Sequence, residues 1–266
     1  MTRFLHILGR LYVVAVYAFI FVPLLIIVLI SFSGDDYLVF PPESWSLRWY
    51  GAVLSNQGFI EGLQNSLIIA VTVMVLSLAI GLPASLALVR LRFPGREFLT
   101  TFVLSPLILP TIVLGLGILI IFFRIGLVAT YPGLVLAHLT LTLPFTIRIL
   151  QTTLSNLPVE VEEAAKTLGA NPFQAFMRVT LPQLMPGLIA SAAISAVLSF
   201  DEIVLSLFIV GPKLTTLPVE IYRYVDERTD PLVAVMAVVL IAVSLGIVIL
   251  VERTVGFART FGGSNR

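Results

Sequence analysis

Two adjacent acids, Asp201 and Glu202, are the residues of this sequence whose type and position could do chemistry, because an apolar stretch at 183–210 surrounds them. An acid in the middle of a membrane costs about 2.5–3.5 kcal/mol on insertion scales, so such residues usually face a partner or a water-filled cavity. A carboxylate there would suit a cationic solute. Adjacent positions differ by about 100° around a helix, so we expect one acid to face a pathway and the other to meet a partner subunit. The alternative for both acids is a hydrogen bond or an ion pair between subunits.

The other reactive residue types are too sparse for a catalytic or metal centre. The chain has no cysteine, which excludes disulfides, thiolate metal sites and a cysteine nucleophile. The two histidines, His6 and His138, do not make a metal cluster, and the scattered serines add no nucleophile-and-base arrangement. Neither Lys166 nor Lys213 lies in a Gly-Lys-Ser/Thr phosphate loop, so the chain cannot hydrolyse ATP by that route. An intramembrane enzyme is therefore disfavoured, and we expect no metal or cofactor in this chain.

The elements that must position the acids are apolar segments long enough to cross a bilayer, which takes about 20 helical residues. The composition, 58% hydrophobic and 12% charged, differs from that of a soluble domain. We predict an all-α polytopic membrane protein, a single domain over 1–266 in a lipid bilayer, with no nucleic-acid partner. Six spans are predicted, at 11–32, 62–89, 98–123, about 133–154, about 183–210 and 231–251. Prolines at 106, 110 and 144 lie inside spans, where they either bend a helix around a cavity or simply pack.

The first span is too long for a secretion signal, whose apolar core takes about 7–15 residues. With six spans both termini share one side of the membrane, and the 16 basic residues then divide eleven to five. The eleven on the side of the termini are Arg3, Arg10, Arg90, Arg92, Arg96, Arg148, Lys166, Arg178, Arg253, Arg259 and Arg266. The positive-inside rule places this side, with both termini, in the cytoplasm.

The segment at about 155–182 is a soluble-looking hairpin between the fourth and fifth spans. Pro158 suits a first helical turn, and acids follow it where the helix dipole favours negative charge. We expect Glu162 and Lys166 to pair across one turn. Gly169 offers a left-handed stop, and the Asn171-Pro172 pair prevents the helix from continuing. One narrow apolar face results, from Val161, Ala164, Ala165 and Leu168.

A second short helix is predicted over about 172–180, before Leu181-Pro182 leads into the fifth span. Its apolar face consists of Phe173, Phe176 and Met177. Two short helices at an angle would make a compact docking surface. The alternative is an amphipathic loop lying on the lipid headgroups, but helices on a membrane surface favour a polar face rich in lysine and arginine, whereas this one is acidic.

The spacing of these residues resembles a known family. Glu163-Ala164-Ala165, three residues, Gly169, nine residues and then Val179-Thr180-Leu181-Pro182 is similar to the EAA loop of ATP-binding-cassette importer permeases, with Val179 where that family usually has isoleucine. The resemblance covers most of the chain. Asn65-Ser66-Leu67, Ser199-Phe200-Asp201-Glu202, Val210-Gly211-Pro212 and Thr215-Thr216-Leu217-Pro218 resemble the second permease subunit of the polyamine (spermidine/putrescine) and opine branch.

The resemblance implies a type I importer with the MetI-like permease fold, in a bacterial inner membrane. Such a complex has two permeases, here a heterodimer of related chains, two cytoplasmic ATPase subunits that use ATP and Mg, and an extracytoplasmic solute-binding protein. The solute would be spermidine or putrescine, with an opine or amino-acid derivative as the alternative. An ion-coupled secondary transporter is the alternative of another class, and the lack of a detectable inverted duplication argues against it.

In that family the helix that carries Glu163 to Gly169 is the coupling helix, which sits in a groove of the ATPase. An apolar helix face in a groove is also a recurrent mode of recognition. The resemblance assigns Glu163 to the ATPase contact and Gly169 to the turn between the short helices. We expect Ala164 and Ala165 to pack closely, so that a bulky residue at Ala165 would separate ATP hydrolysis from transport. Leu168, Phe173, Leu181 and Pro182 complete the predicted coupling surface.

Overall fold

The computed structural model describes residues 2–261, and every regular element within them is a helix. Arg266, together with the side chains of Arg3 and Arg259, lies outside this description. The chain forms two compact units. One unit combines the residues up to Ile60 with Glu220–Ala242, and the other combines Glu61–Val219 with the segment from Val243 onward. The first unit holds α1 (Thr2–Ser31) and α2 (Arg48–Ser55), most of α11 (Leu217–Glu227) and the beginning of α12 (Leu232–Phe261).

The second unit holds the candidate site. Its elements are α3 (Gln57–Arg90, from Glu61), α4 (Arg96–Leu104), η1 (Ser105–Leu107), α5 (Thr111–Ile125), α6 (Tyr131–Ser155), α7 (Val159–Thr167), α8 (Pro172–Ala175), η2 (Phe176–Thr180), α9 (Leu181–Phe200), α10 (Val204–Ile209) and the rest of α12. Five helices in the described part of the chain are long and apolar enough to cross a membrane, and a bent pair would make a sixth. The all-α polytopic prediction is confirmed.

The third predicted span, 98–123, is not one continuous helix. Its two parts, Arg96–Leu107 and Thr111–Ile125, meet at an angle of 103°. Pro106 lies in the single 3-10 turn η1, and Pro110 has the extended ψ of 129° that precedes α5. Proline removes a helical hydrogen bond and clashes with the preceding turn, so two prolines four positions apart explain the bend. Pro144, by contrast, lies inside the unbroken α6.

The fifth predicted span differs from 183–210 at both ends. At its beginning the predicted second short helix is not separate, because α8 and η2 lead without interruption into α9. The element η2 is a π-helical turn, in which the N–H of Leu181 donates to the carbonyl of Phe176. Pro182 would clash with the carbonyl four residues before it in a regular helix, and the wider turn makes room for its ring. At its other end α9 stops at Phe200.

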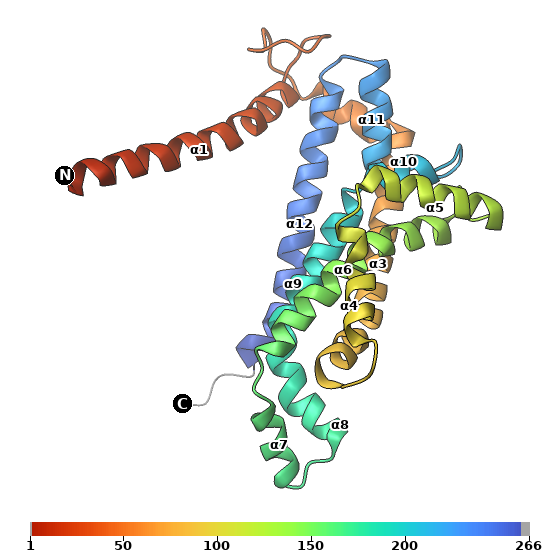
Figure 1. The fold of residues 1–266 in the computed structure, drawn as a ribbon. Helices are drawn as coiled ribbons and strands as arrows, with labels where there is room; N and C mark the ends of the chain where they lie inside the picture. Colours follow the sequence, from red (N-terminus) through yellow and green to blue (C-terminus); the bar gives the residue numbers. More distant parts are fainter. Residues whose placement is uncertain (1, 262–266) are drawn as a thin grey trace. The chain divides into compact units, whose positions relative to one another are not determined.

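The helices α6 and α9 lie side by side, and α7 and α8 project beyond their common end (Figure 1). Their packing relies on small and polar residues, as expected where lipid is as apolar as the core. The hydroxyls of Thr146 and Ser195 are 2.7 Å apart. A side chain at Gly187 would place its Cβ 2.9 Å from the Cβ of Thr153, so only glycine allows this close approach. The α6–α9 pair is therefore a specific contact that supports the projecting hairpin.

Candidate functional site

The projecting hairpin, which we call the knob, comprises residues 159–180. Gly169 has a φ of +93°, and the chain turns there as predicted. The N–H of Gly169 donates to Lys166 and that of Ala170 to Ala165, at 3.0 and 3.1 Å. This is the Schellman pattern of a helix end that uses glycine. A capping box then starts α8, since Asn171 and Gln174 bond each other's backbone N–H at 2.8 and 3.2 Å. The turn is therefore well defined.

Glu162 links the two arms of the knob, which are α7 on one side of the turn and α8 with η2 on the other. One carboxylate oxygen lies 2.9 Å from the Lys166 ammonium, which confirms the predicted pair. The other accepts a hydrogen bond from the buried hydroxyl of Thr180 at 3.0 Å. The hydrogen bond from Lys166 holds the pKa of Glu162 below its ordinary value of 4.5. The link to Thr180 crosses 18 residues of sequence and was not predicted.

Several large apolar side chains of the knob are exposed. Leu168 is 89% exposed and Phe173 is 68% exposed, and Val159, Val161 and Met177 are also exposed. Glu163 and Ala164 are exposed, whereas Ala165 is half-buried. Leu181, half-buried, and Pro182, exposed, belong to the first turn of α9 rather than to the loop. Large apolar side chains exposed together on a short hairpin favour an interaction surface.

The Glu162 tie should make the knob sensitive to acid. The pKa of Glu162 is lower in the folded protein than in an unfolded chain, so its stabilising contribution is present above pH 4.5 and is lost as pH falls through the folded value. We expect amide hydrogen exchange in α7, corrected for its intrinsic pH dependence, to increase over that range. Glu162→Gln, which has no carboxylate to protonate, should show no such transition. An unchanged transition in this variant would mean that another group is responsible.

The two acids lie at a break between helices, so the helical geometry predicted for them is wrong. Asp201 caps the end of α9 with φ −90° and ψ 0°, and α10 begins at Val204. Glu202 accepts the N–H of Leu205 at 2.8 Å, and thus satisfies a donor in the first turn of α10. Asp201 is exposed and accepts a hydrogen bond from Ser244 on α12 at 2.9 Å. The acids therefore have different surroundings.

A buried histidine joins the two sides of this break. His138 on α6 is 1% exposed, with Nδ1 2.9 Å from the Ser199 hydroxyl and Nε2 3.0 Å from the Ser206 hydroxyl. The Ser206 hydroxyl donates to the carbonyl of Glu202 at 2.9 Å, so it must accept from Nε2–H of His138. Nδ1 makes the second hydrogen bond, with Ser199. These contacts hold α9 and α10 to α6.

Removal of this histidine should destabilise the break. His138→Leu deprives two buried serines of their partner, and we expect it to lower the free energy of unfolding by about 1–3 kcal/mol. His138→Gln, whose amide can both donate and accept, should restore part of the loss. Thermal unfolding of the purified protein in lipid would measure both. Equal stability of wild type and His138→Leu would contradict the role of this hydrogen-bond chain.

Residues 77–255, which include α6, the knob and both acids, match the family described as binding-protein-dependent transport system inner membrane component. The chain belongs to this family. The permease therefore works in an importer whose solute arrives on a separate binding protein. Like its relatives, it is an inner-membrane, multi-pass subunit.

Relatives of the permease extend over nearly its whole length. It is 31% identical to the spermidine/putrescine transport system permease protein PotC of Escherichia coli K12, over 91% of this chain and 93% of PotC. It is 30% identical to the putrescine transport system permease protein PotI of the same strain, over 87% of this chain and 84% of PotI. A crystallised bacterial ABC transporter that imports alginate has the same fold, with a TM-score of 0.70, 19% identity and 96% coverage of both chains. These matches confirm the fold and the permease assignment.

Two structural residues of the permease were missed from sequence. Glu162 was recognised only as a partner of Lys166, and His138 was considered only as a possible metal ligand or catalytic base. The available signal for His138 was its position in a row with Thr142 and Thr146, each four residues apart on α6 and each buried. Thr142 bonds Ser77 at 2.9 Å, as Thr146 bonds Ser195. A polar row at helical spacing in a membrane span predicts contacts between helices.

Proposed function

We propose that the permease forms half of the translocation pathway of a polyamine importer and pairs with a second, related permease. PotC is named as a permease of a spermidine/putrescine transport system and PotI as a permease of a putrescine transport system. These names support a polyamine as the solute. Two ATPase subunits and an extracytoplasmic solute-binding protein complete the proposed complex. The permease contributes no ATP hydrolysis, and the ATP and Mg are used by its partner.

The knob is the proposed docking element for the ATPase. The observation that carries this proposal is the exposure of Leu168 and Phe173 on a hairpin that a Schellman turn, a capping box and the Glu162 contacts hold in shape. A preorganised apolar surface binds with little loss of conformational entropy. Glu163 and Ala164 would touch the groove directly. Ala165, being half-buried, would set how closely α7 packs.

Of the two acids, Asp201 is the proposed pathway residue. It is exposed, and Ser244 occupies only one of its carboxylate oxygens. Glu202 instead caps α10, so its proposed role is to shape the break. A single carboxylate with a free oxygen can accept an ammonium group of a passing polyamine. The proposal keeps the expected division into one pathway acid and one other acid, and it gives Glu202 a structural role in place of the expected contact with a partner subunit.

The proposed orientation places both termini and the knob in the cytoplasm, within one permease domain over 1–266. The eleven-to-five division of basic residues supports this orientation. Lys166 and Arg178 of the knob are two of these eleven residues. ATP binding would then move the knob as a rigid body and turn the attached helices α6 and α9.

The proposal can be tested with the complete complex in lipid vesicles. Spermidine, putrescine, an opine and an uncharged sugar are offered, and ATP hydrolysis and uptake are measured together. We expect spermidine or putrescine to stimulate both. Glu163→Arg should abolish stimulation, whereas Glu252→Arg, the same charge reversal at an exposed site on α12, should not. If only the opine is taken up, the proposal that the solute is a polyamine is wrong. If Glu163→Arg keeps full activity, Glu163 has no role in coupling to the ATPase.

A further inference from the structure

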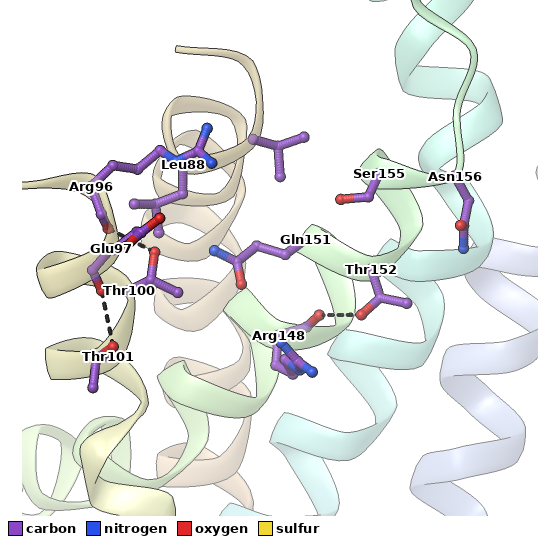
Figure 2. Close-up of a pocket in the computed structure, with 11 residues that line it drawn as sticks. Leu88, Arg96, Glu97, Thr100, Thr101, Arg148, Gln151, Thr152, Ser155 and Asn156 are labelled. Carbon is purple, nitrogen blue, oxygen red and sulfur yellow. Dashed lines mark hydrogen bonds between the residues drawn. The ribbon is translucent and has the colours of Figure 1, made fainter. Parts of the chain in front are cut away.

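A polar cavity of about 670 Å³ lies where α3 ends, α4 begins and α6 approaches the knob. Figure 2 shows the side chain of Gln151 extending from α6 toward the side chains of α4. Its lining is Leu88, Val89, Arg96, Glu97, Thr100, Thr101, Arg148, Gln151, Thr152, Ser155 and Asn156. The acids at 201 and 202 are not part of it, so the proposed solute pathway does not account for it.

Two arginines of this cavity lack protein partners. Arg148 lies inside α6, seven positions before its last residue, and Arg96 is the first residue of α4. Among the described residues, neither guanidinium forms an ion pair or a hydrogen bond with another side chain. Arg148 is exposed and Arg96 is half-buried, so a ligand from outside this chain can reach both guanidinium groups.

The rest of the lining suits an oxyanion. Arg148, Gln151, Thr152 and Ser155 recur at i, i+3, i+4 and i+7, and so form one polar stripe of α6. Gln151, Ser155 and Asn156 carry N–H or O–H groups that can donate to an oxyanion. The hydroxyls of Thr100, Thr101 and Thr152 do not contribute, because they already donate to carbonyls one turn earlier, at 2.9, 2.9 and 3.0 Å. Two arginines and one glutamate give the lining a net charge of +1, since 2 − 1 = 1. That charge is matched by one negatively charged phosphodiester.

We propose that this cavity binds the phosphate group of an anionic phospholipid headgroup or a free phosphate. Guanidinium groups match phosphate oxygens in geometry, and basic pockets between membrane helices bind phospholipid headgroups. Phe98 and Phe102 on α4 are 74% and 64% exposed and stack at 6.2 Å, so an apolar surface for acyl chains lies on the helix that bears Arg96. The lipid source is therefore favoured over the free ion.

The test compares lipid retention by the complete complex after reconstitution in phosphatidylcholine, with or without phosphatidylglycerol. Native mass spectrometry after release from nanodiscs is expected to show bound phosphatidylglycerol on the wild type. Arg96→Gln with Arg148→Gln should reduce retention to the phosphatidylcholine background. Arg253→Gln removes an exposed positive charge from α12 and should retain the lipid. If the wild type retains both lipids equally, the cavity does not select an anionic headgroup. If Arg253→Gln loses as much phosphatidylglycerol as the double variant does, retention depends on overall charge rather than on this cavity. Either result would overturn the proposal that the ligand is a phospholipid.

A second arm addresses the free ion. Inorganic phosphate is added to the complex in phosphatidylcholine, and the thermal unfolding temperature is followed. A phosphate-dependent increase in the wild type that is lost in the double variant, without a preference for phosphatidylglycerol, would identify free phosphate as the ligand. If the wild type shows neither response, the cavity has no oxyanion ligand and the proposal is wrong.

Because the chain has no cysteine, a single cysteine can be introduced in the cavity and modified chemically after the complex has folded and assembled. In Thr152→Cys a thiol reagent can fill the cavity after assembly, and no other residue of this chain will react. We expect the modified complex to lose phosphatidylglycerol and the unmodified one to keep it. Retention after complete modification would overturn the site even if the arginine variants failed to assemble.

Discussion

Replacement of Leu168 by aspartate is expected to leave the permease folded in the membrane while it loses its ATPase subunit. The side chain is 89% exposed and makes little contribution to the fold, so the cost should appear only in the complex. Burial of a leucine in a groove contributes about 1.5–3 kcal/mol, and a buried carboxylate adds a further penalty. Affinity for the ATPase should therefore fall by about ten- to several hundredfold.

Binding of purified ATPase to the permease in nanodiscs would measure this change. Leu91→Asp is the matched control, because Leu91 is also exposed and lies in the short turn after α3, outside the knob. It should bind the ATPase as the wild type does. If Leu168→Asp binds normally, the apolar face of the knob is not the contact. If both variants lose binding, the effect is one of added charge rather than of location.

Asp201→Asn is expected to reduce uptake of spermidine and putrescine strongly while ATP hydrolysis continues. The substitution keeps the shape and the hydrogen bond from Ser244, but it removes the negative charge that would meet an ammonium group. Loss of one such charge-assisted contact, worth about 1.5–3 kcal/mol, should reduce transport by about ten- to a hundredfold.

Glu202→Gln is the adjacent control for Asp201→Asn. Its amide oxygen can still accept the N–H of Leu205, so α10 should keep its first turn and uptake should remain near that of the wild type. Vesicle uptake and ATP hydrolysis measured on the same preparation separate transport from coupling. The reverse result, with Glu202→Gln inactive and Asp201→Asn active, would exchange the two roles.

Local chemistry made the knob predictable. The stop at Gly169, the restart at Asn171-Pro172 and the Glu162–Lys166 pair each involve residues within one turn of each other, so spacing alone identified them. The spacing of the same residues carried the family resemblance. The contact between Glu162 and Thr180 could not be read in this way, because it depends on how the two arms of the knob lie together.

The breaks within the membrane spans were harder to predict from the sequence. The signal for the bend at Pro106 and Pro110 was present in the sequence, but the apolar run around it was long enough to read as one span. The break at Asp201 has no proline or glycine at 198–209. It is stabilised by Glu202, which accepts from the first turn of α10, and by the contacts of His138 on α6, and the sequence alone does not show that these groups meet.

From sequence alone the permease could be assigned to a membrane and to an all-helical fold, and the turn of its helical hairpin could be located, because hydropathy and turn chemistry act over a few residues. Only the folded chain distinguished Asp201 from Glu202, revealed His138 as the link across the break and gathered Arg96 and Arg148 at one cavity. These features depend on side chains that lie many residues apart. Their partners are set by how the helices pack, and packing is not encoded in the spacing of any single segment.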